Sequence, residues 1–314
     1  MDSFSLTLAI VSLLCLVVGT PLNFLAVAYF AKSPSRTLAN RLFMTISSID
    51  GLLCMSMLNS FIALVRELEK DTATRSLICI VISWIWNIVS RLSLFLSSVL
   101  SVTRAVSLYR PFSSIPTRPI VALVAAELVY LILYECSPSF TSHRVPVYNY
   151  GNCDWSVDKP SAVPYQMFYS LAYCLPLILT IGSSMASFCL LRRNKTRFGD
   201  LRRKEANTYQ KQCYAANTIF ILVIVYALCN VPYGIVLLLI NLEIISGYDI
   251  RNLFYKEFYS HCNALGSVYL VAINAAATPL VFLLRIQEFR IFIKRASVRA
   301  KFVSQDHTRN ETNL

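Results

Sequence analysis

CIVISWIWNIVSRLSLFLSSVLSVTRAVSLYRPF, residues 79–112, is the stretch that decides the fold class. It is apolar enough to cross a bilayer, which takes about 20 such residues, yet it holds Arg91 near its middle and Arg104 towards its end. At about 100° per residue, one narrow helical face would carry Trp86, Ser90, Ser93, Ser97 and Arg104. A helix that faces lipid would not keep such a stripe. We therefore predict a transmembrane helix at the centre of a bundle.

The composition of the whole chain is typical of a membrane protein. Hydrophobic residues make up 56% of the 314 residues and charged residues 15%, whereas soluble domains have about 25% charged residues. Seven apolar runs are long enough to span a bilayer, and they cover residues 5–31, 38–65, 76–109, 119–137, 163–192, 213–242 and 258–284. We expect no cleavable signal peptide, because residues 1–31 lack a basic start. The sequence predicts an all-α membrane protein with one seven-transmembrane helix bundle over residues 1–314.

The basic residues between these spans predict their orientation. Of the 29 Lys and Arg residues, 21 fall on the side that holds the C-terminal tail, and seven fall on the side of the N-terminus. The positive-inside rule places the richer side in the cytoplasm and the N-terminus outside. The net charge of +12 is therefore explained by topology, and nucleic-acid binding is not expected.

Short motifs occur along the spans in a fixed order. Asn23 follows Gly19-Thr20-Pro21-Leu22, Asp50 lies in the second span, and Thr103-Arg104-Ala105 ends the span that Cys79 opens. The sixth span holds Cys229-Asn230-Val231-Pro232, and the seventh holds Asn274 and then Thr278-Pro279-Leu280-Val281-Phe282. In order and spacing these motifs resemble, with substitutions, those of the rhodopsin-like (class A) G-protein-coupled receptors. The degenerate motifs and the short N-terminus resemble invertebrate orphan or chemosensory receptors.

The resemblance implies a disulfide bond between Cys79, at the outer end of the third span, and Cys153, in the second outer loop. Cys136 and Cys262 also lie near the outer face, where a second bridge is an alternative to two free thiols. Five cysteines within the spans are interpreted as small apolar side chains, and they are Cys15, Cys54, Cys174, Cys189 and Cys229.

For signalling, the resemblance implies that Arg104 contacts a heterotrimeric G protein in the active state and is held by acidic residues in the inactive state. Thr103 and Gln212 stand where many members of the family carry those acids. Pro232 removes a backbone hydrogen bond and would allow the sixth helix to swing outward. The resemblance implies that Pro279 and Phe282 have the corresponding role in the seventh helix.

Asp50 has to face the bundle interior, because an unpaired acid in a bilayer costs about 2.5 kcal/mol or more. Its role is either that of a hydrogen-bond hub or, as the resemblance implies, that of an allosteric sodium ligand together with Ser93 and Asn274. Asn23 is a further buried polar residue, and Thr278 replaces an asparagine of the family's sodium site. We expect no other metal and no other cofactor.

The candidate residues of the ligand pocket lie in the outer half of the third span, and they are Trp86, Asn87, Ser90 and Arg91. Trp86 stands where amine receptors carry an aspartate, which argues against a monoamine ligand. No lysine lies between Lys256 and Lys294, so the retinal-binding lysine of the family has no counterpart. We expect an extracellular chemosensory compound or a peptide as the ligand.

Arg91 needs a partner, because its place near the bilayer centre would cost about 3 kcal/mol or more if the charge were unpaired. Glu127 in the fourth span is the predicted partner, since it lies at nearly the same depth when residues are counted from the outer ends of the two helices. Alternatively, Arg91 binds an acidic group of the ligand, since its guanidinium matches a carboxylate. Glu135 is expected to lie too near the outer surface to compete.

After Arg285, apolar residues recur at helical spacing among basic ones, which predicts an amphipathic helix over residues 286–302 on the inner leaflet, followed by a short cytoplasmic tail. This segment matches the eighth helix of the family, although it has no cysteine for a palmitoyl anchor. The glycosylation sequons at Asn194 and Asn310 fall on the predicted cytoplasmic side and are interpreted as accidental.

The sequence thus predicts a plasma-membrane receptor that binds an extracellular ligand and activates a heterotrimeric G protein. The alternative is a seven-helix transporter or channel that uses the buried charges Asp50, Arg91 and Glu127. An enzyme is not expected, because no His-x-x-x-His, paired aspartates or Gly-x-Ser-x-Gly occurs within a span.

Overall fold

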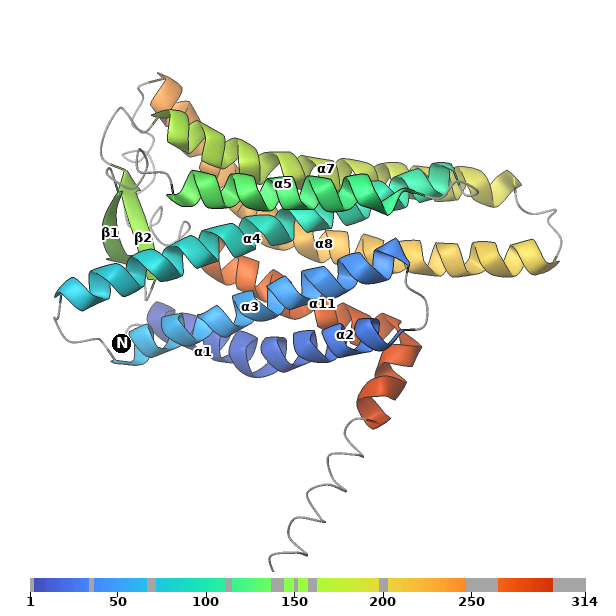
Figure 1. The fold of residues 1–314 in the computed structure, drawn as a ribbon, viewed down its shortest axis with the longest axis horizontal. Helices are drawn as coiled ribbons and strands as arrows, with labels where there is room; N and C mark the ends of the chain where they lie inside the picture. The colour runs from blue at the N-terminus through green and yellow to red at the C-terminus, as the bar shows by residue number, and fades with distance from the viewer. Residues whose placement is uncertain are drawn as a thin grey trace, which may run out of the picture.

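The computed structural model describes residues 3–33, 37–66, 72–110, 115–136, 144–149, 152–157, 163–197, 203–246 and 265–295. Within these residues, seven helical segments are long and apolar enough to cross a membrane (Figure 1). The predicted all-α seven-helix bundle is therefore confirmed.

The elements follow one another in this order. The first span consists of α1 (Ser3–Leu14), η1 (Cys15–Gly19) and α2 (Thr20–Lys32), and the next are α3 (Leu38–Arg66), α4 (Thr72–Tyr109) and α5 (Thr117–Cys136). The strands β1 (Arg144–Asn149) and β2 (Asn152–Val157) precede α7 (Val163–Arg197) and α8 (Arg203–Ser246). The seventh span consists of η3 (Leu265–Leu270) and α11 (Val271–Arg285), and residues 287–295 are helical as well.

Several helices extend beyond the apolar runs that predicted them. α4 begins at Thr72 instead of residue 76, α7 continues to Arg197 instead of residue 192, and α8 begins at Arg203 instead of residue 213. The turns added to α7 and α8 at the basic end are rich in Lys, Arg and Gln, which are good helix formers but too polar for a hydropathy pattern to include. The predicted parts 258–264 of the seventh span and 296–302 of the amphipathic helix lie outside the described residues.

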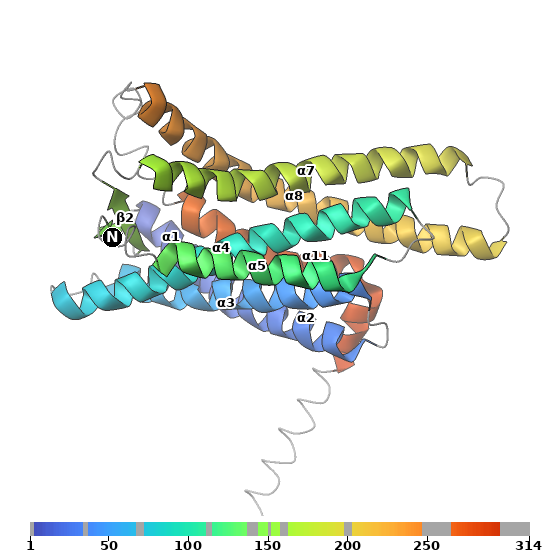
Figure 2. The same cartoon turned by 45° about the horizontal axis from the view of Figure 1, so that its top comes forward.

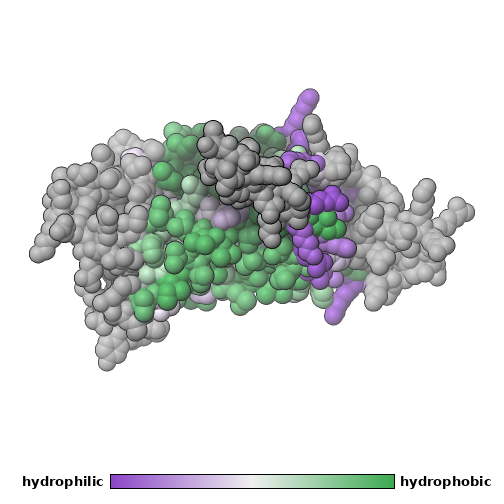
Figure 3. All heavy atoms as spheres, turned by 90° about the horizontal axis from the view of Figure 1, so that it is seen from below, coloured by the Kyte–Doolittle hydropathy of each residue, from purple (hydrophilic) through white to green (hydrophobic). Residues whose placement is uncertain are grey.

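The two ends of the bundle differ in character. At one end, named here the basic end, the spans finish or begin at Lys32, Arg110, Arg118, Arg193 and Arg285. The N-terminus and the β1–β2 hairpin lie together at the opposite end, named here the hairpin end (Figures 1 and 2). Between the ends runs a broad apolar surface, which hydrophilic side chains border at the basic end (Figure 3). This is the surface expected of a protein that spans a bilayer.

α4 is the central helix of the bundle, as its serine stripe predicted. It packs against α3, α5 and α7, and its hairpin-end half contacts both strands. Of its membrane span, 56% is buried inside the protein, whereas the corresponding share of α5 is 11%. α5 is therefore a peripheral helix that exposes most of its surface to lipid.

A close approach of three helices is centred on Gly19, at the end of the π-helical η1. A Cβ atom at this position would lie 2.7 Å from Sγ of Cys54 on α3 and 2.8 Å from Cβ of Ala276 on α11. The wider π-helical turn immediately precedes Pro21, which has no N–H to donate to a regular helical bond. The glycine thus lets the first span pack tightly against α3 and α11, next to the polar residues of the core.

Candidate functional site

Asp50 occupies the middle of the bundle with its side chain only 1% exposed. Ser93 on α4 donates a hydrogen bond from Oγ to Oδ1 of Asp50 at 2.7 Å. Among the residues that the structure describes, Oδ2 of Asp50 is buried without a hydrogen bond of ordinary geometry, and the hydroxyl of Thr278 lies close to this carboxylate. Asn274 and Thr278 are also buried, on α11, and Thr278 Oγ1 donates to the carbonyl oxygen of Asn274 at 3.1 Å.

Asn23, predicted as a further buried polar residue, connects the first and the last span. Its Nδ2 donates to the carbonyl oxygen of Gly19 and to that of Ala275 on α11, at 3.0 Å in both cases. The amide nitrogen therefore fixes α2 against α11 directly. Asn23 Oδ1, like Asp50 Oδ2, lies buried without a hydrogen bond of ordinary geometry in the described part of the chain.

The donor set around Asp50 suits a hard monovalent cation. A buried carboxylate oxygen without an ordinary hydrogen bond is costly unless a proton, a water or a cation faces it, and the neighbouring groups offer hydroxyl and amide oxygens. By contrast, the described residues contain no group of three or more His, Cys, Asp or Glu side chains that would suit a transition metal. The residues thus fit the predicted sodium ion chemically.

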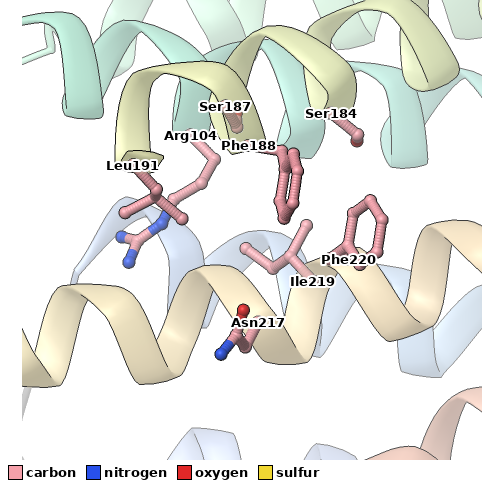
Figure 4. A pocket seen from close by; sticks show the side chains of 8 residues that line it. All are labelled: Arg104, Ser184, Ser187, Phe188, Leu191, Asn217, Ile219 and Phe220. Carbon is pink, nitrogen blue, oxygen red and sulfur yellow. The ribbon is translucent and has the colours of Figure 1, made fainter. Parts of the chain in front are cut away.

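Arg104 lies in a cleft at the basic end of the bundle, between α4, α7 and α8. Figure 4 shows its guanidinium reaching into the space between α7 and α8. The side chains that line this cleft are Arg104, Ser184, Ser187, Phe188, Leu191, Asn217, Ile219 and Phe220. The rings of Phe188 and Phe220 stack across the cleft with centroids 5.3 Å apart.

The cleft is closed to a large partner in this conformation. Its empty volume is about 310 Å³, open solvent included. A single inserted α-helix, about 10 Å across, would need several times this volume over three turns. Because α7 and α8 form opposite walls, a shift of either helix would widen the cleft and expose Arg104.

The other predicted activation residues are on α4, α8 and α11, and those on α11 do not line the cleft. Thr103 donates its hydroxyl to the carbonyl oxygen of Leu100 in its own helix at 2.9 Å, and the side chain of Gln212 lies outside the described ones. Pro232 lies inside α8 and Pro279 inside α11. Phe282 is fully buried in an aromatic cluster that joins α2, α3 and the helix after α11, and its ring partners are Phe30, Phe43 and Phe289.

The candidate pocket residues of α4 do not all point the same way. Trp86 packs against Leu53 and Cys54 of α3 and Ala272 of α11, and thus faces the interior as predicted. Asn87 is partly buried, and Ser90 donates its hydroxyl back to the carbonyl oxygen of Asn87 at 3.3 Å. Arg91 instead faces α5.

The predicted pairing of Arg91 with Glu127 is wrong. Nη2 of Arg91 lies 2.8 Å from Oε1 of Glu135, and the two side chains are 2% and 0% exposed. The guanidinium also lies over the ring of Tyr134, 5.2 Å from its centroid. Glu127 is partly exposed on α5, two turns nearer the basic end.

The pairing was mispredicted because the depth of Arg91 was counted from Cys79 at the outer end of the apolar run. α4 begins at Thr72, well before Cys79, so the outer end of the apolar run was not the end of the helix. Counted from the basic end instead, Arg91 is as far along the chain from Tyr109, the last residue of α4, as Glu135 is from Thr117, the first residue of α5. Both side chains are therefore at one level, towards the hairpin end. Glu135 is the last but one residue of α5, and Arg91 lies nearer to this end than the bilayer centre at which it was expected.

The predicted Cys79–Cys153 disulfide stays a prediction. The backbones of both residues are described, in α4 and β2, and these two elements contact each other. Their side chains lie outside the described ones, as does that of Cys136, and Cys262 lies outside the described residues altogether. The five cysteines assigned to the spans are free thiols, as expected for small apolar side chains.

Sequence reasoning missed three polar contacts of the bundle besides the Arg91 pair. Tyr173 of α7 hydrogen-bonds Asn230 of α8, Tyr214 of α8 stacks beneath Arg285 of α11, and Tyr29 of α2 hydrogen-bonds Glu288 after α11. An asparagine inside an apolar span signalled that Asn230 needs a partner. Tyrosine is common in such spans, so the sequence carried no signal that Tyr29, Tyr173 and Tyr214 would make these contacts.

Comparisons with known proteins agree with this geometry. The family model described as "7 transmembrane receptor (rhodopsin family)" matches residues 22–281. The crystal structure of squid rhodopsin resembles the fold with a TM-score of 0.73, covering 96% of this chain and 87% of that chain, at 14% sequence identity. No curated protein sequence matches the chain. At 14% sequence identity, this structural similarity is evidence for the fold alone.

Proposed function

Because the chain belongs to the rhodopsin family of seven-transmembrane receptors, we propose that it is a plasma-membrane receptor that detects an extracellular ligand and activates a heterotrimeric G protein. The observation that carries the proposal is the closed cleft at the basic end, with Arg104 inside it and walls formed by two long helices. In this proposal the basic end is cytoplasmic and the hairpin end extracellular, in line with the positive-inside rule.

Activation is a shift between two arrangements of the bundle. A ligand at the hairpin end favours whichever arrangement it binds more tightly, and it shifts the population by that difference in affinity. Pro232 lies inside α8 and supplies a hinge, because its ring removes one helical hydrogen bond. Movement of the basic half of α8 away from α7 widens the cleft, so that the G protein reaches Arg104.

The pocket for the ligand lies at the hairpin end, where Trp86, Asn87 and Ser90 of α4 are the candidate contacts. Arg91 is a weaker candidate than its sequence suggested, because Glu135 already neutralises its charge. An extracellular chemosensory compound and a peptide are the two ligand classes that we propose. A carboxylate-bearing ligand would have to compete with a buried ion pair.

We also propose that Asp50 and Ser93, with Asn274 and Thr278 nearby, hold an allosteric sodium ion. The support is the unsatisfied Oδ2 of Asp50 beside a serine hydroxyl. A sodium ion there would supply the positive charge that the buried carboxylate lacks. Replacing sodium by a large organic cation should then change ligand affinity in the parent protein and leave it unchanged in Asp50→Asn.

The function is tested with a panel of peptides and small molecules on cells that express the receptor with a promiscuous G protein. We expect at least one compound to raise signalling, and we expect Arg104→Ala, at equal surface density, to abolish the response without abolishing ligand binding. A response that Arg104→Ala leaves intact would contradict the proposed contact.

The alternative function, a transporter or channel, has less support once the surroundings of the buried charges are considered. That alternative relied on a chain of buried charges through Asp50, Arg91 and Glu127, but Arg91 is neutralised by α5 and Glu127 is partly exposed. Guanine nucleotides separate the two functions. They lower the agonist affinity of a receptor that couples to a G protein, whereas substrate binding to a transporter is indifferent to them.

A further inference from the structure

Tyr173 and Asn230 form a buried polar contact between α7 and α8. Their side chains are 3% and 0% exposed, and Tyr173 donates its hydroxyl to Oδ1 of Asn230 at 2.9 Å. Nδ2 of Asn230 in turn donates to the carbonyl oxygen of Tyr226, one turn earlier in α8, at 2.8 Å. The amide is thus held from both sides, and its orientation is fixed by α7.

This contact lies directly beside the hinge of α8. Asn230 precedes Pro232 by two residues, on the half of α8 that leads to the basic end and has to move when the cleft opens. Tyr233 follows Pro232 and packs against η3, where a Cβ atom added to Gly266 would lie 3.0 Å from Cβ of Tyr233. α8 therefore packs against η3 on the hairpin-end side of Pro232 and is hydrogen-bonded to α7 on the basic-end side.

Tyr173 contacts both sides of the hinge. Besides its hydrogen bond to Asn230, its ring packs edge-on against the ring of Tyr233, with centroids 5.0 Å apart and planes at 90°. A rotation of α8 about Pro232 changes the position of Asn230 relative to Tyr233. Such a rotation therefore strains or breaks one of these two contacts of Tyr173, and loss of the hydrogen bond leaves the buried amide oxygen of Asn230 without this donor.

We propose that Tyr173 is the positioning residue that holds α8 in the closed arrangement, through its hydrogen bond to Asn230, and so sets the threshold for activation. The inference rests on the proposed function for its signalling consequence, but not for its structural one. This restraint at the hinge would add to the contacts that Arg104 makes at the basic end.

The test removes the hydroxyl and keeps the ring. We expect Tyr173→Phe to raise the ratio of active to inactive receptor without ligand about fivefold, which is the effect of one ordinary hydrogen bond on a two-state equilibrium. The double variant Tyr173→Phe, Asn230→Leu leaves no polar group unpaired, so it should fold well and show the same increase. Tyr130→Phe, which removes an exposed hydroxyl from α5, is the control and should signal like the parent protein.

A second readout does not depend on any G protein. Spin labels at Arg110 on the basic end of α4 and at Gln210 on α8, in a background with Cys189 and Cys213 replaced by serine, report the distance across the cleft. We expect a larger population of long distances in Tyr173→Phe and in the double variant than in the parent, even in a protein that activates no G protein. Unchanged distances in both variants would overturn the inference, whether or not the parent signals. A lower melting temperature with unchanged distances and signalling would also overturn it, since it would indicate a structural role only.

Discussion

Arg91 and Glu135 show what a charged residue requires inside a membrane-spanning bundle. An isolated arginine or acid costs up to about 2.5–3.5 kcal/mol at the centre of a span on insertion scales, and each of the two lowers this kind of cost for the other. Their separation of 2.8 Å, at full burial, is that of a close ion pair. Loss of one partner leaves the other as an uncompensated buried charge, which typically costs about 3–5 kcal/mol.

An exchange of the two charges tests the pair. We expect Arg91→Glu and Glu135→Arg each to reduce surface expression strongly and the double variant to recover a substantial part of it, since opposite charges again meet between α4 and α5. Glu127→Gln is the matched control, because it removes the other acid of α5, and it should express close to the parent level. Rescue by Glu127→Arg instead of Glu135→Arg would contradict the structure.

Thr103 is the position at which we expect an introduced negative charge to restrain Arg104 in the closed state. Its hydroxyl is bonded within α4, so the side chain contributes no negative charge beside the arginine. A carboxylate at this position would gain about 1.5–3 kcal/mol by a charge-assisted contact in the closed state. Thr103→Asp should therefore lower ligand-independent signalling about tenfold or more, measured at equal surface density, while the uncharged Thr103→Asn should lower it far less. Equal signalling in all three proteins would contradict this role.

At this scale the sequence predicted which residues need partners but not which partners they find. The depth of Asp50 and Arg91 within apolar runs was sufficient to predict their burial and the need for compensation. The choice between Glu127 and Glu135 depended on where the helices begin and how α4 lies against α5. Neither is contained in the spacing of residues along one helix.

α8 is the element on which the proposed activation depends, and it also contacts α11 at the basic end. The guanidinium of Arg285, the last residue of α11, lies 4.8 Å from the ring centroid of Tyr214. Tyr214 is half exposed, and cation–π contacts at such sites contribute about 0.5–1 kcal/mol. The contact joins two helices that separate if the basic half of α8 moves outward.

We expect the loss of this contact to favour the open cleft. Tyr214→Leu and Arg285→Gln should each raise ligand-independent signalling about two- to fivefold, in proportion to the cation–π energy, and the double variant should do no more than either single change. Tyr214→Phe keeps the aromatic face and should behave like the parent protein. If Tyr214→Phe and Tyr214→Leu raise signalling equally, the ring is not the restraint.

The elements could be predicted well where apolar length decides them. Residues 38–65 form α3 nearly to the residue, because both ends coincide with a change from apolar to polar. The extensions of α7 and α8 were missed because a hydropathy pattern detects only the apolar part of a helix, which lies in the bilayer. The π-helical turns η1 and η3 were missed too, since they depend on Pro21 and on contacts between helices that no local pattern reveals.

For the molecule as a whole, the order and spacing of degenerate motifs carried more information than any one of them. The motifs carry substitutions, yet the order and spacing of Asn23, Asp50, Arg104, Pro232 and Pro279 sufficed to indicate the family, while the apolar runs predicted the bundle. The ligand could not be predicted in the same way. A pocket is shaped by side chains from several helices, and Arg91 shows that a residue on the right helix can still face a neighbour.

We expect a disulfide bond to join α4 to the β1–β2 hairpin and to stabilise the extracellular end of the molecule. A disulfide between Cys79 and Cys153 would close a long loop and contribute about 2–4 kcal/mol to the stability of that end. Cys79→Ser and Cys153→Ser should each reduce surface expression or ligand response, and the double variant should be no worse than the single ones. Additive losses would exclude the pairing, as would equal masses of the denatured protein after alkylation with and without prior reduction.

Nucleotide exchange with purified components tests the proposed function most directly. The receptor is placed in lipid nanodiscs with one class of Gα and its βγ subunits at a time, and the rate of guanine-nucleotide exchange is compared with that of empty nanodiscs. We expect the parent protein to accelerate exchange on at least one class even without ligand, Tyr173→Phe to accelerate it further, and Arg104→Gln to abolish the effect. Exchange rates equal to those of empty nanodiscs for every class, in the parent protein and in Tyr173→Phe alike, would contradict the conclusion that this chain activates G proteins.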